Sequence, residues 1–432
     1  MVDKKQIKNN NYGDSFAKKK SVKRKFLKGL LTFFIIGVLA LGSFLVHKAY
    51  FSNIISDTAQ NNLSETQNNL SKYQIRAQEI LQSMSLKDKI GQMFMLDTDA
   101  IVYGSRQELS AGVNLNSADQ NSSFNKKELE ELAKYNPGGI ILFGGNIESK
   151  DQVKEFIASM QKSVKYPLFI GTDQEGGRVN RLKNAGIAQF SSMSEIGQTR
   201  NPLAACDVGA AFGKQMKEMG FNLDFAPVAD VNTNPNNPVI GERSFGNDPH
   251  EVAKMVAEEV KCMQQENISS ALKHFPGHGD TSTDSHTGLP TVETDLNGLK
   301  SVELVPFSAG INAGADFVLT AHISIPKVDP SGLPATMSKI ILTDILQNDL
   351  KFSGLIITDA LDMSAIWDNY SPREIVENCL NAGVDILLVP KDFYKTYNAF
   401  LDLAQSDAIS QTRIDKSVYK ILQTKLKRGI IS

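Results

Sequence analysis

The sequence predicts an α/β protein built on a single (β/α)8 barrel of the TIM type, preceded by an N-terminal transmembrane helix. Three observations support this fold class. Eight short, almost entirely apolar runs recur after residue 90, amphipathic helical stretches separate them, and no Gly/Pro-rich boundary divides the chain from residue 85 to its C-terminus. Apolar runs that alternate with helices indicate parallel strands buried on both faces. Eight such units are typical of a closed barrel.

The predicted strands are four to eight residues long, as buried strands usually are. They are expected at residues 92–96, 139–143, 167–173, 223–230, 270–275, 316–323, 354–360 and 384–389. A doubly wound open sheet is the alternative architecture. The chain lacks the Gly-rich dinucleotide fingerprint after its first strand, so the closed barrel is preferred.

Helices are expected wherever apolar residues recur with helical spacing. The first begins near Tyr73, and Ser85 caps a second, shorter one. The longer helices between strands are expected at residues 149–164, 202–220, 249–265 and 338–350. Residues 102–123 form a polar excursion, which we expect to be a mobile insertion at one end of the barrel.

The N-terminal region differs in charge from the rest of the chain. Residues 1–48 carry a net charge of +9, which leaves −11 for the remainder of a chain whose total is −2. An acidic body argues against a nucleic-acid partner, because phosphate binding needs clustered Lys and Arg. The basic residues instead precede Gly29–Val46, eighteen residues without a charge that are long enough to cross a bilayer core.

This pattern predicts a single-pass membrane protein. The Lys/Arg cluster before the apolar stretch keeps the N-terminus in the cytoplasm and places the following chain outside the cell. We expect a cytoplasmic basic tail (1–28), a transmembrane anchor (29–46), a polar linker (47–72) and a catalytic barrel (73–432). The alternative is a cleaved signal and a secreted protein, although no good cleavage site follows the apolar stretch.

The chain has three cysteines: Cys206, Cys262 and Cys379. An extracellular location would permit disulfides. Their odd number, wide separation and apolar surroundings show no paired framework, so we expect buried free thiols.

Polar residues stand at the ends of several predicted strands, where a barrel builds its active site. These residues are Asp173, Asp230, Lys273, His274, His322 and Asp359. Each one alone is equally compatible with a structural ion pair. Placing so many charged groups directly after apolar runs costs stability unless they are paired or hydrated, so a purely structural role for the whole set is disfavoured.

The densest group of such residues lies in the segment 273–290, KHFPGHGDTSTDSHTGLP, a Pro- and Gly-containing loop. It permits two interpretations. In the first, a metal ion is held by residues with common zinc-ligand chemistry: His274, His278, Asp280, Asp284 and His286. No helix aligns these residues as in a zinc-binding helix motif, which disfavours the metal.

In the second interpretation, Asp284 and His286 form an acid/base pair. A carboxylate two residues from an imidazole can orient one ring nitrogen and leave the other to exchange a proton. Asp359, at a strand end beside cations such as Lys273 or Arg243, is then the candidate nucleophile.

The loop and four further motifs together resemble the β-N-acetylhexosaminidase (NagZ-like) branch of glycoside hydrolase family 3. The motifs are GGIILFGGN (138–146), DQEGGRVNRL (173–182), FAPVADVNTNPNNPVIGERSFGNDP (225–249) and ITDALDM (357–363), and the likeness covers roughly residues 85–425. The resemblance implies that Asp359 is the catalytic nucleophile, His286 the general acid/base and Asp284 its partner. It also implies that five residues hold the terminal sugar: Asp173, Arg181, Arg243, Lys273 and His274.

We therefore expect a retaining exo-β-N-acetylglucosaminidase that releases terminal N-acetylglucosamine from peptidoglycan fragments or related glycans. The enzyme is expected to need no cofactor or metal, to contact the membrane through its N-terminal helix and to be a monomer. The chain ends soon after its eighth strand, so no second α/β domain is expected. The alternatives are a β-N-acetylglucosaminide phosphorylase, a broader β-glycosidase of the same family, and a non-enzymatic protein that binds the cell wall.

Overall fold

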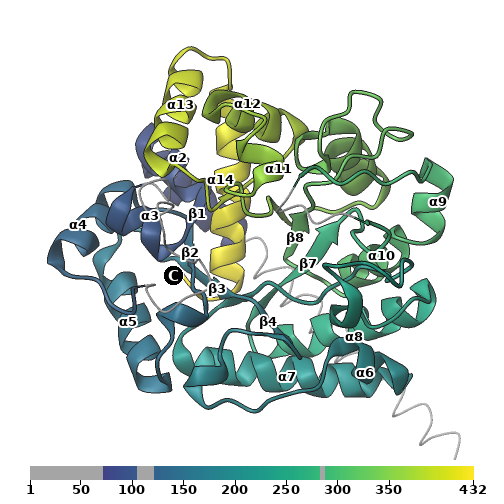
Figure 1. Cartoon of the computed structure of the whole chain (residues 1–432). Helices are drawn as coiled ribbons and strands as arrows, with labels where there is room; N and C mark the ends of the chain where they lie inside the picture. Colours follow the sequence, from purple (N-terminus) through teal and green to yellow (C-terminus); the bar gives the residue numbers. More distant parts are fainter. Residues whose placement is uncertain (1–71, 105–120, 283–287) are drawn as a thin grey trace, which may run out of the picture. The chain divides into compact units, whose positions relative to one another are not determined.

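Eight parallel strands form the centre of the structure, a computed structural model that describes residues 72–104, 121–282 and 288–432 (Figure 1). The strands are β1 (Phe94–Leu96), β2 (Gly139–Ile141), β3 (Phe169–Thr172), β6 (Leu223–Asp224), β7 (Ser269–Phe275), β8 (Phe317–Thr320), β9 (Leu355–Ile357) and β10 (Leu387–Leu388). All eight fall at predicted runs. Their order is β10-β1-β2-β3-β6-β7-β8-β9, and a parallel bridge between Ile357 and Ile386 joins the two ends. The predicted eight-stranded barrel is confirmed.

Helices surround the strands, as Figure 1 shows. The described α-helices after residue 85 are α2 (Leu86–Gln92), α3 (Thr98–Tyr103), α4 (Lys126–Tyr135), α5 (Lys150–Ser163), α6 (Met193–Gln198), α7 (Pro202–Met219), α8 (Pro249–Gln265), α9 (Leu296–Ser301), α10 (Leu304–Asn312), α11 (Ser364–Trp367), α12 (Pro372–Ala382), α13 (Phe393–Gln405) and α14 (Gln411–Lys427). Residues 72–83 form a further helix before α2. Short helical turns are η1 (Gly144–Asn146), η2 (Lys183–Ala185), η3 (Gly241–Arg243) and η4 (Ala335–Met337).

Helix α8 illustrates how the sequence specifies these elements. The Asp248 carboxylate caps the helix by accepting the backbone N–H groups of His250 and Glu251, and Pro249 occupies the first turn, where its missing N–H costs nothing. Its buried apolar face includes Val252, Val256, Val260 and Met263. Each such side chain stabilises the fold by roughly 1.5–3 kcal/mol relative to exposure, and the spacing of the face directs α8 onto the barrel.

Two elements depart from expectation. The strands β4 (Gln174–Gly176) and β5 (Val179–Asn180) form an antiparallel hairpin directly after β3, where no hairpin was predicted. The helix expected at residues 338–350 is present as η5 (Ile340–Asp349), which is wound as a π-helix. Leu350 N–H donates to Ile345 O, five residues back, at 2.9 Å. Amphipathic spacing does not distinguish this winding from an α-helix.

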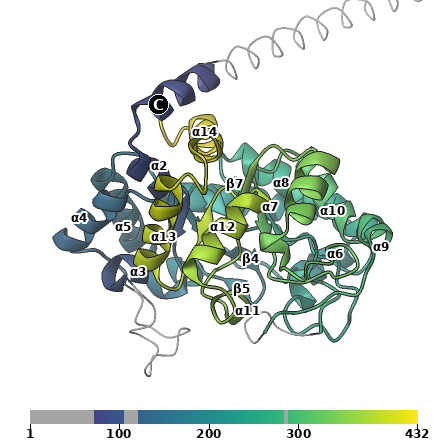
Figure 2. The same cartoon turned by 90° about the horizontal axis from the view of Figure 1, so that it is seen from above.

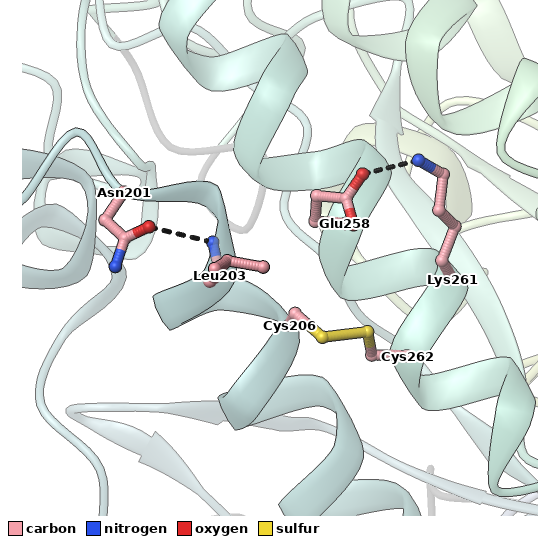
Figure 3. Close-up of a disulfide and its surroundings, with 6 residues drawn as sticks. All are labelled: Asn201, Leu203, Cys206, Glu258, Lys261 and Cys262. Carbon is pink, nitrogen blue, oxygen red and sulfur yellow. Dashed lines mark hydrogen bonds and ion pairs between the residues drawn. A yellow bond between two sulfur atoms is a disulfide. The ribbon is translucent and has the colours of Figure 1, made fainter. Parts of the chain in front are cut away.

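The expectation of three free thiols is wrong for two of them. Cys206 on α7 and Cys262 on α8 form a disulfide across 56 residues of sequence, whereas Cys379 is free and buried (Figure 3). The pairing arises because α7 and α8 pack along each other and bring their cysteine Cα atoms within 5.1 Å. Wide sequence separation therefore concealed a pair that is made by tertiary packing.

Several predictions concern residues outside the described ranges. They include the basic tail, the anchor at residues 29–46, nearly all of the polar linker and residues 105–120 of the predicted insertion. Among the described residues, no helix is long and apolar enough to cross a membrane. The predicted anchor stays a prediction.

Candidate active site

A cavity of about 240 Å³ lies at the C-terminal ends of the strands. In Figure 2 this end of the barrel carries α11 and the β4–β5 hairpin, opposite α2 and α14. The cavity walls contain all six of the predicted site residues that the structure describes: Asp173, Arg181, Arg243, Lys273, His274 and Asp359. The structure thus brings together residues that are up to 186 positions apart in the sequence.

The barrel positions these residues through its strand ends. Asp173 directly follows β3, Lys273 and His274 belong to β7, and Asp359 follows β9 by one intervening residue. Parallel strands end at the same edge of the sheet, so side chains from separate strands converge there. Arg181 directly follows β5, and Arg243 is the last residue of η3. Both side chains line the same cavity.

Glu175 lies at the centre of a buried charge network in the cavity wall. Its carboxylate binds the Arg243 guanidinium through two hydrogen bonds of 2.8 Å, one to Nε and one to Nη2. Lys273 Nζ lies 2.5 Å from Glu175 Oε1 and 2.7 Å from Asp173 Oδ1. Two cations and two carboxylates therefore balance one another, and bidentate geometry fixes the guanidinium plane.

This network favours the charged forms of Glu175, Arg243 and Lys273 despite their burial. Burial by itself raises the pKa of Glu175, but the charges of Arg243 and Lys273 outweigh burial and hold that pKa well below its usual range. Burial lowers the pKa of Lys273, yet Asp173 and Glu175 raise it above the ordinary lysine value. The cavity consequently presents fixed N–H donors at neutral pH.

Asp230 holds the start of the 273–290 loop. Its buried carboxylate accepts a hydrogen bond from His274 Nδ1 at 2.7 Å and from the backbone N–H of His278, also at 2.7 Å. Because Nδ1 carries the proton and donates it in a hydrogen bond to Asp230, His274 Nε2 can accept from Arg243 Nη2, 3.3 Å away. Burial opposes the ionised form of Asp230, but His274 holds its pKa below the usual value.

Close backbone packing fixes the same loop. A Cβ atom placed on Gly279 would lie 1.8 Å from the backbone oxygen of Val231, so only glycine fits there. His278 also lines the cavity, and its Nδ1 lies 2.8 Å from Thr281 Oγ1. Burial, followed by the neighbouring His274, lowers the pKa of His278, which favours its neutral form.

Asp359 is held by backbone groups on both sides. Its own N–H donates to Thr320 O of β8 at 3.2 Å, and its Oδ1 accepts the N–H of Ala360 at 2.8 Å. Elsewhere in the cavity wall, the buried Nε of Arg181 has no hydrogen-bond partner among the described residues. A buried N–H without a partner in a cavity wall is suited to bind a ligand.

A second hollow, of about 360 Å³, lies beside the N-terminal half of α14. Two of the three cations in its lining, Arg413 and Lys420, already have partners. Arg413 Nε donates to Leu380 O at 2.8 Å, and Lys420 pairs with Asp385. This hollow lacks the convergent, ligand-ready donors of the strand-end cavity, which we take as the candidate active site.

Asp284 and His286 lie outside the described residues. Within the described part of the chain, no group of three or more His, Cys, Asp or Glu side chains is placed to hold a metal ion. The alternative metal site includes Asp284 and His286, so it stays a hypothesis together with the acid/base pair.

Sequence reasoning missed Glu175 altogether and gave Asp230 and His278 no role in the sugar site. Glu175 stands two residues after Asp173, a spacing that places both side chains on one face of an extended segment. That alternation was the available signal. The pairing of Glu175 with Arg243, 68 residues away, was not readable from the motif.

Comparison with known proteins identifies the family. Residues 85–424 match the N-terminal domain of glycosyl hydrolase family 3. The chain belongs to glycosyl hydrolase family 3. The family predicted from the sequence is thereby confirmed.

Individual family 3 relatives cover most of the barrel. The chain is 38% identical over 329 residues to beta-hexosaminidase A of Pseudoalteromonas piscicida, an alignment that covers 69% of this chain and 55% of that protein. It is 34% identical over 274 residues to a beta-hexosaminidase of Xylella fastidiosa strain M23, covering 62% of this chain and 80% of that protein. The matched part thus spans little more than half the length of the Pseudoalteromonas protein.

Among solved structures, the chain is similar to a family 3 β-N-acetylglucosaminidase from Paenibacillus sp. str. FPU-7. The TM-score is 0.73 at 34% sequence identity, and the match covers 81% of this chain and 63% of that chain. The family 3 barrel is therefore shared over most of the described residues.

Proposed function

We propose that this family 3 chain is a retaining exo-β-N-acetylglucosaminidase. The observation that carries the proposal is the strand-end cavity, in which Asp359 shares the walls with five predicted sugar-binding residues. At about 240 Å³ the cavity is smaller than most drug-sized ligand sites, which suits one terminal sugar and hence exo action. The relatives named beta-hexosaminidase and β-N-acetylglucosaminidase support N-acetylglucosamine as that sugar.

In the proposed reaction, a carboxylate oxygen of Asp359 attacks the anomeric carbon while the bond to the leaving oxygen breaks. The imidazolium of His286 gives its proton to that oxygen, and neutral His286 then takes a proton from the water that hydrolyses the glycosyl-enzyme. Asp284 orients the imidazole. The ionised Asp359 also stabilises the positive charge that develops at the anomeric carbon.

The charged network supplies the sugar contacts. Lys273 and Arg243 are anchored by Glu175, so their remaining N–H groups stand ready for hydroxyl oxygens without reorganisation. Arg181 Nε, which has no partner among the described residues, is a further donor. Asp173, whose Oδ1 accepts from Lys273 Nζ, also lines the cavity and is assigned as an acceptor for a sugar hydroxyl.

We place this domain outside the cell, held by the apolar segment at residues 29–46. The Cys206–Cys262 disulfide supports that placement, because disulfides persist in oxidising compartments. Terminal N-acetylglucosamine on peptidoglycan fragments or related wall glycans is then the accessible substrate.

The decisive experiment compares two chromogenic substrates. Purified full-length chain is given nitrophenyl N-acetyl-β-glucosaminide and nitrophenyl β-glucoside, with Asp359→Ala as control. We expect hydrolysis of the first substrate only, lost in the variant. A folded wild-type chain that cleaves neither substrate, with or without phosphate, would reject the proposal in favour of a binding protein.

Product analysis separates the remaining alternatives. Proton NMR of the first-formed sugar should show the β-anomer, as retention requires. Sugar 1-phosphate formed in phosphate buffer would instead identify a phosphorylase.

A further inference from the structure

His322 is the one residue of the predicted strand-end set whose role neither the resemblance nor the network accounts for. It follows β8 by one residue, is fully buried, and does not line the cavity. Its imidazole contacts Ala360, the residue next to the proposed nucleophile. A polar side chain in this position either ties two strands together or acts on the site through Ala360.

The imidazole binds oxygen atoms at both ring nitrogens. Nε2 lies 3.0 Å from the backbone oxygen of Ala360, and Nδ1 lies 2.8 Å from Thr336 Oγ1. A carbonyl oxygen can only accept a hydrogen bond, so Nε2 carries the proton that reaches Ala360.

Thr336 holds the ring on its Nδ1 side. Its hydroxyl also lies 3.0 Å from Ala321 O and 2.9 Å from Thr320 Oγ1, and Thr336 itself is fully buried. The imidazole therefore has one firmly defined orientation, with Nε2 directed at the segment after β9.

The peptide that His322 binds is held at both ends. His322 holds its carbonyl oxygen, which belongs to Ala360, and Leu388 O of β10 accepts its N–H, which belongs to Leu361, at 3.0 Å. The N–H of Ala360 in turn donates to Asp359 Oδ1 at 2.8 Å. His322 therefore holds Ala360 in place, and the N–H of Ala360 orients the carboxylate of Asp359.

We propose that His322 is a positioning residue that aims the Asp359 carboxylate at the anomeric carbon by clamping the Ala360–Leu361 peptide. The inference rests on the proposed function, in which Asp359 is the nucleophile. Misplacing a reacting group by about 1 Å can cost roughly 100-fold in rate, so a peptide clamp is sufficient to matter.

Two conservative variants separate the two ring contacts. The amide nitrogen of Gln occupies the place of imidazole Nε2, whereas that of Asn occupies the place of Nδ1. His322→Gln should keep a donor to Ala360 O, and His322→Asn should keep only the contact with Thr336. Both variants retain a polar amide at this buried site, and their melting temperatures show how far their folding costs agree.

The experiment measures kcat on nitrophenyl N-acetyl-β-glucosaminide, the inhibition constant of free N-acetylglucosamine and the melting temperature of each full-length chain. We expect His322→Asn to lower kcat by roughly 100-fold, with inhibition by the free sugar changed less than about threefold. His322→Gln should recover at least tenfold of the lost kcat at a similar melting temperature. The pH limbs of kcat/KM should stay in place, because the proposed role of His322 involves no proton transfer.

Three outcomes overturn the inference: equal kcat for the Asn and Gln variants, parallel loss of kcat and sugar binding, or disappearance of a pH limb. Failure of the underlying function is visible separately. If wild-type chain is inactive, or Asp359→Ala retains activity, the nucleophile assignment fails. If both behave as proposed and His322→Asn keeps full kcat, only the positioning role is rejected.

Discussion

The two ends of the barrel each bury a lysine, and the pKa values of the two lysines are shifted in opposite directions. At the C-terminal end, Lys273 is 2% exposed and contacts the carboxylates of Asp173 and Glu175, which raise its pKa. At the N-terminal end, Lys425 of α14 is 0% exposed, and burial lowers its pKa to about 7. The two lysines are almost equally buried, so the groups that contact each amine determine the direction of its pKa shift.

The partners of Lys425 are neutral. Its Nζ lies 2.7 Å from Gln92 Oε1 and 5.1 Å from the centroid of the Phe169 ring. An amide oxygen and a ring face stabilise an ammonium less than two carboxylates do. Charges at the C-terminal end are thus kept ready for a ligand, whereas α14 closes the N-terminal end at some cost in stability.

The largest expected effect separates activity from stability at the C-terminal end. Asp359→Asn keeps the side-chain volume but removes the proposed nucleophile, so kcat should fall by roughly four orders of magnitude. The melting temperature should change by no more than a few degrees, because Asn keeps an Oδ1 atom that can accept the N–H of Ala360. Steady-state kinetics and a thermal melt test both parts, and near-normal turnover would remove Asp359 from the chemistry.

The next variant breaks the network itself. Glu175→Gln leaves Lys273 and Arg243 without their central carboxylate, and losing one partner of a buried charge pair costs about 3–5 kcal/mol. We expect kcat/KM to fall by roughly 100-fold or more, because both cations lose their orientation.

Urea unfolding and kinetics measure the two effects of Glu175→Gln together. The matched control is Glu242→Gln, since Glu242 pairs with Arg178 at 3.9 Å with both side chains about half exposed. Exposed pairs contribute about 0–1 kcal/mol, so this control should be close to wild type. Equal effects from the two substitutions would contradict the role given to Glu175.

These two variants show where sequence reasoning succeeded and where it stopped. The barrel strands were predictable because each is buried on both faces and therefore almost wholly apolar, as in the run at residues 384–389 around β10. Asp359 and Lys273 were visible as charges interrupting such runs. Glu175 was not recognisable as a site residue, because its role depends on an ion pair with Arg243, which belongs to a different segment of the chain.

Other features depended on packing or winding that no local pattern encodes. The Cys206–Cys262 bond requires the contact between α7 and α8, and η5 has the same apolar spacing as an α-helix. Lys425 was equally unreadable, because it sits within a basic, amphipathic helix whose last turn enters the barrel end. The roles of Asp284 and His286 stay predictions.

The disulfide links α7 and α8, two helices that pack against each other. In Figure 3 it joins α7 and α8, with the Glu258–Lys261 pair beside it. Replacing both cysteines by serine should lower the free energy of unfolding by about 2–4 kcal/mol, since the bond closes a loop of 56 residues. Urea unfolding of the double variant, against Cys379→Ser as a single-site thiol control, measures this loss; kcat of the folded double variant should stay within about threefold.

The smallest effect tests the N-terminal end. Lys425→Met removes the buried amine, whose folded pKa of about 7 lies below its ordinary value of 10.5. The unfolded chain therefore holds more protons between these values, so this lysine makes stability rise with pH from about 7 to 10.5 and is most costly below pH 7. The full penalty is a few kcal/mol, but the variant also leaves Gln92 Oε1 unpaired at a cost of about 1–3 kcal/mol.

We accordingly expect Lys425→Met to be roughly 1 kcal/mol more stable than wild type at pH 7. That advantage should shrink and then reverse as pH rises toward 10.5, because the folded amine is by then neutral and the unfolded amine has lost half of its protons at that pH. Urea unfolding at pH 7 and pH 10 gives the difference, and all other titrating groups cancel between the two chains. A difference independent of pH would mean that Lys425 keeps its proton as Lys273 does. Helix α14 lies opposite α11 and the β4–β5 hairpin (Figure 2). We therefore expect kcat to be unchanged, which separates closure of one barrel end from chemistry at the other.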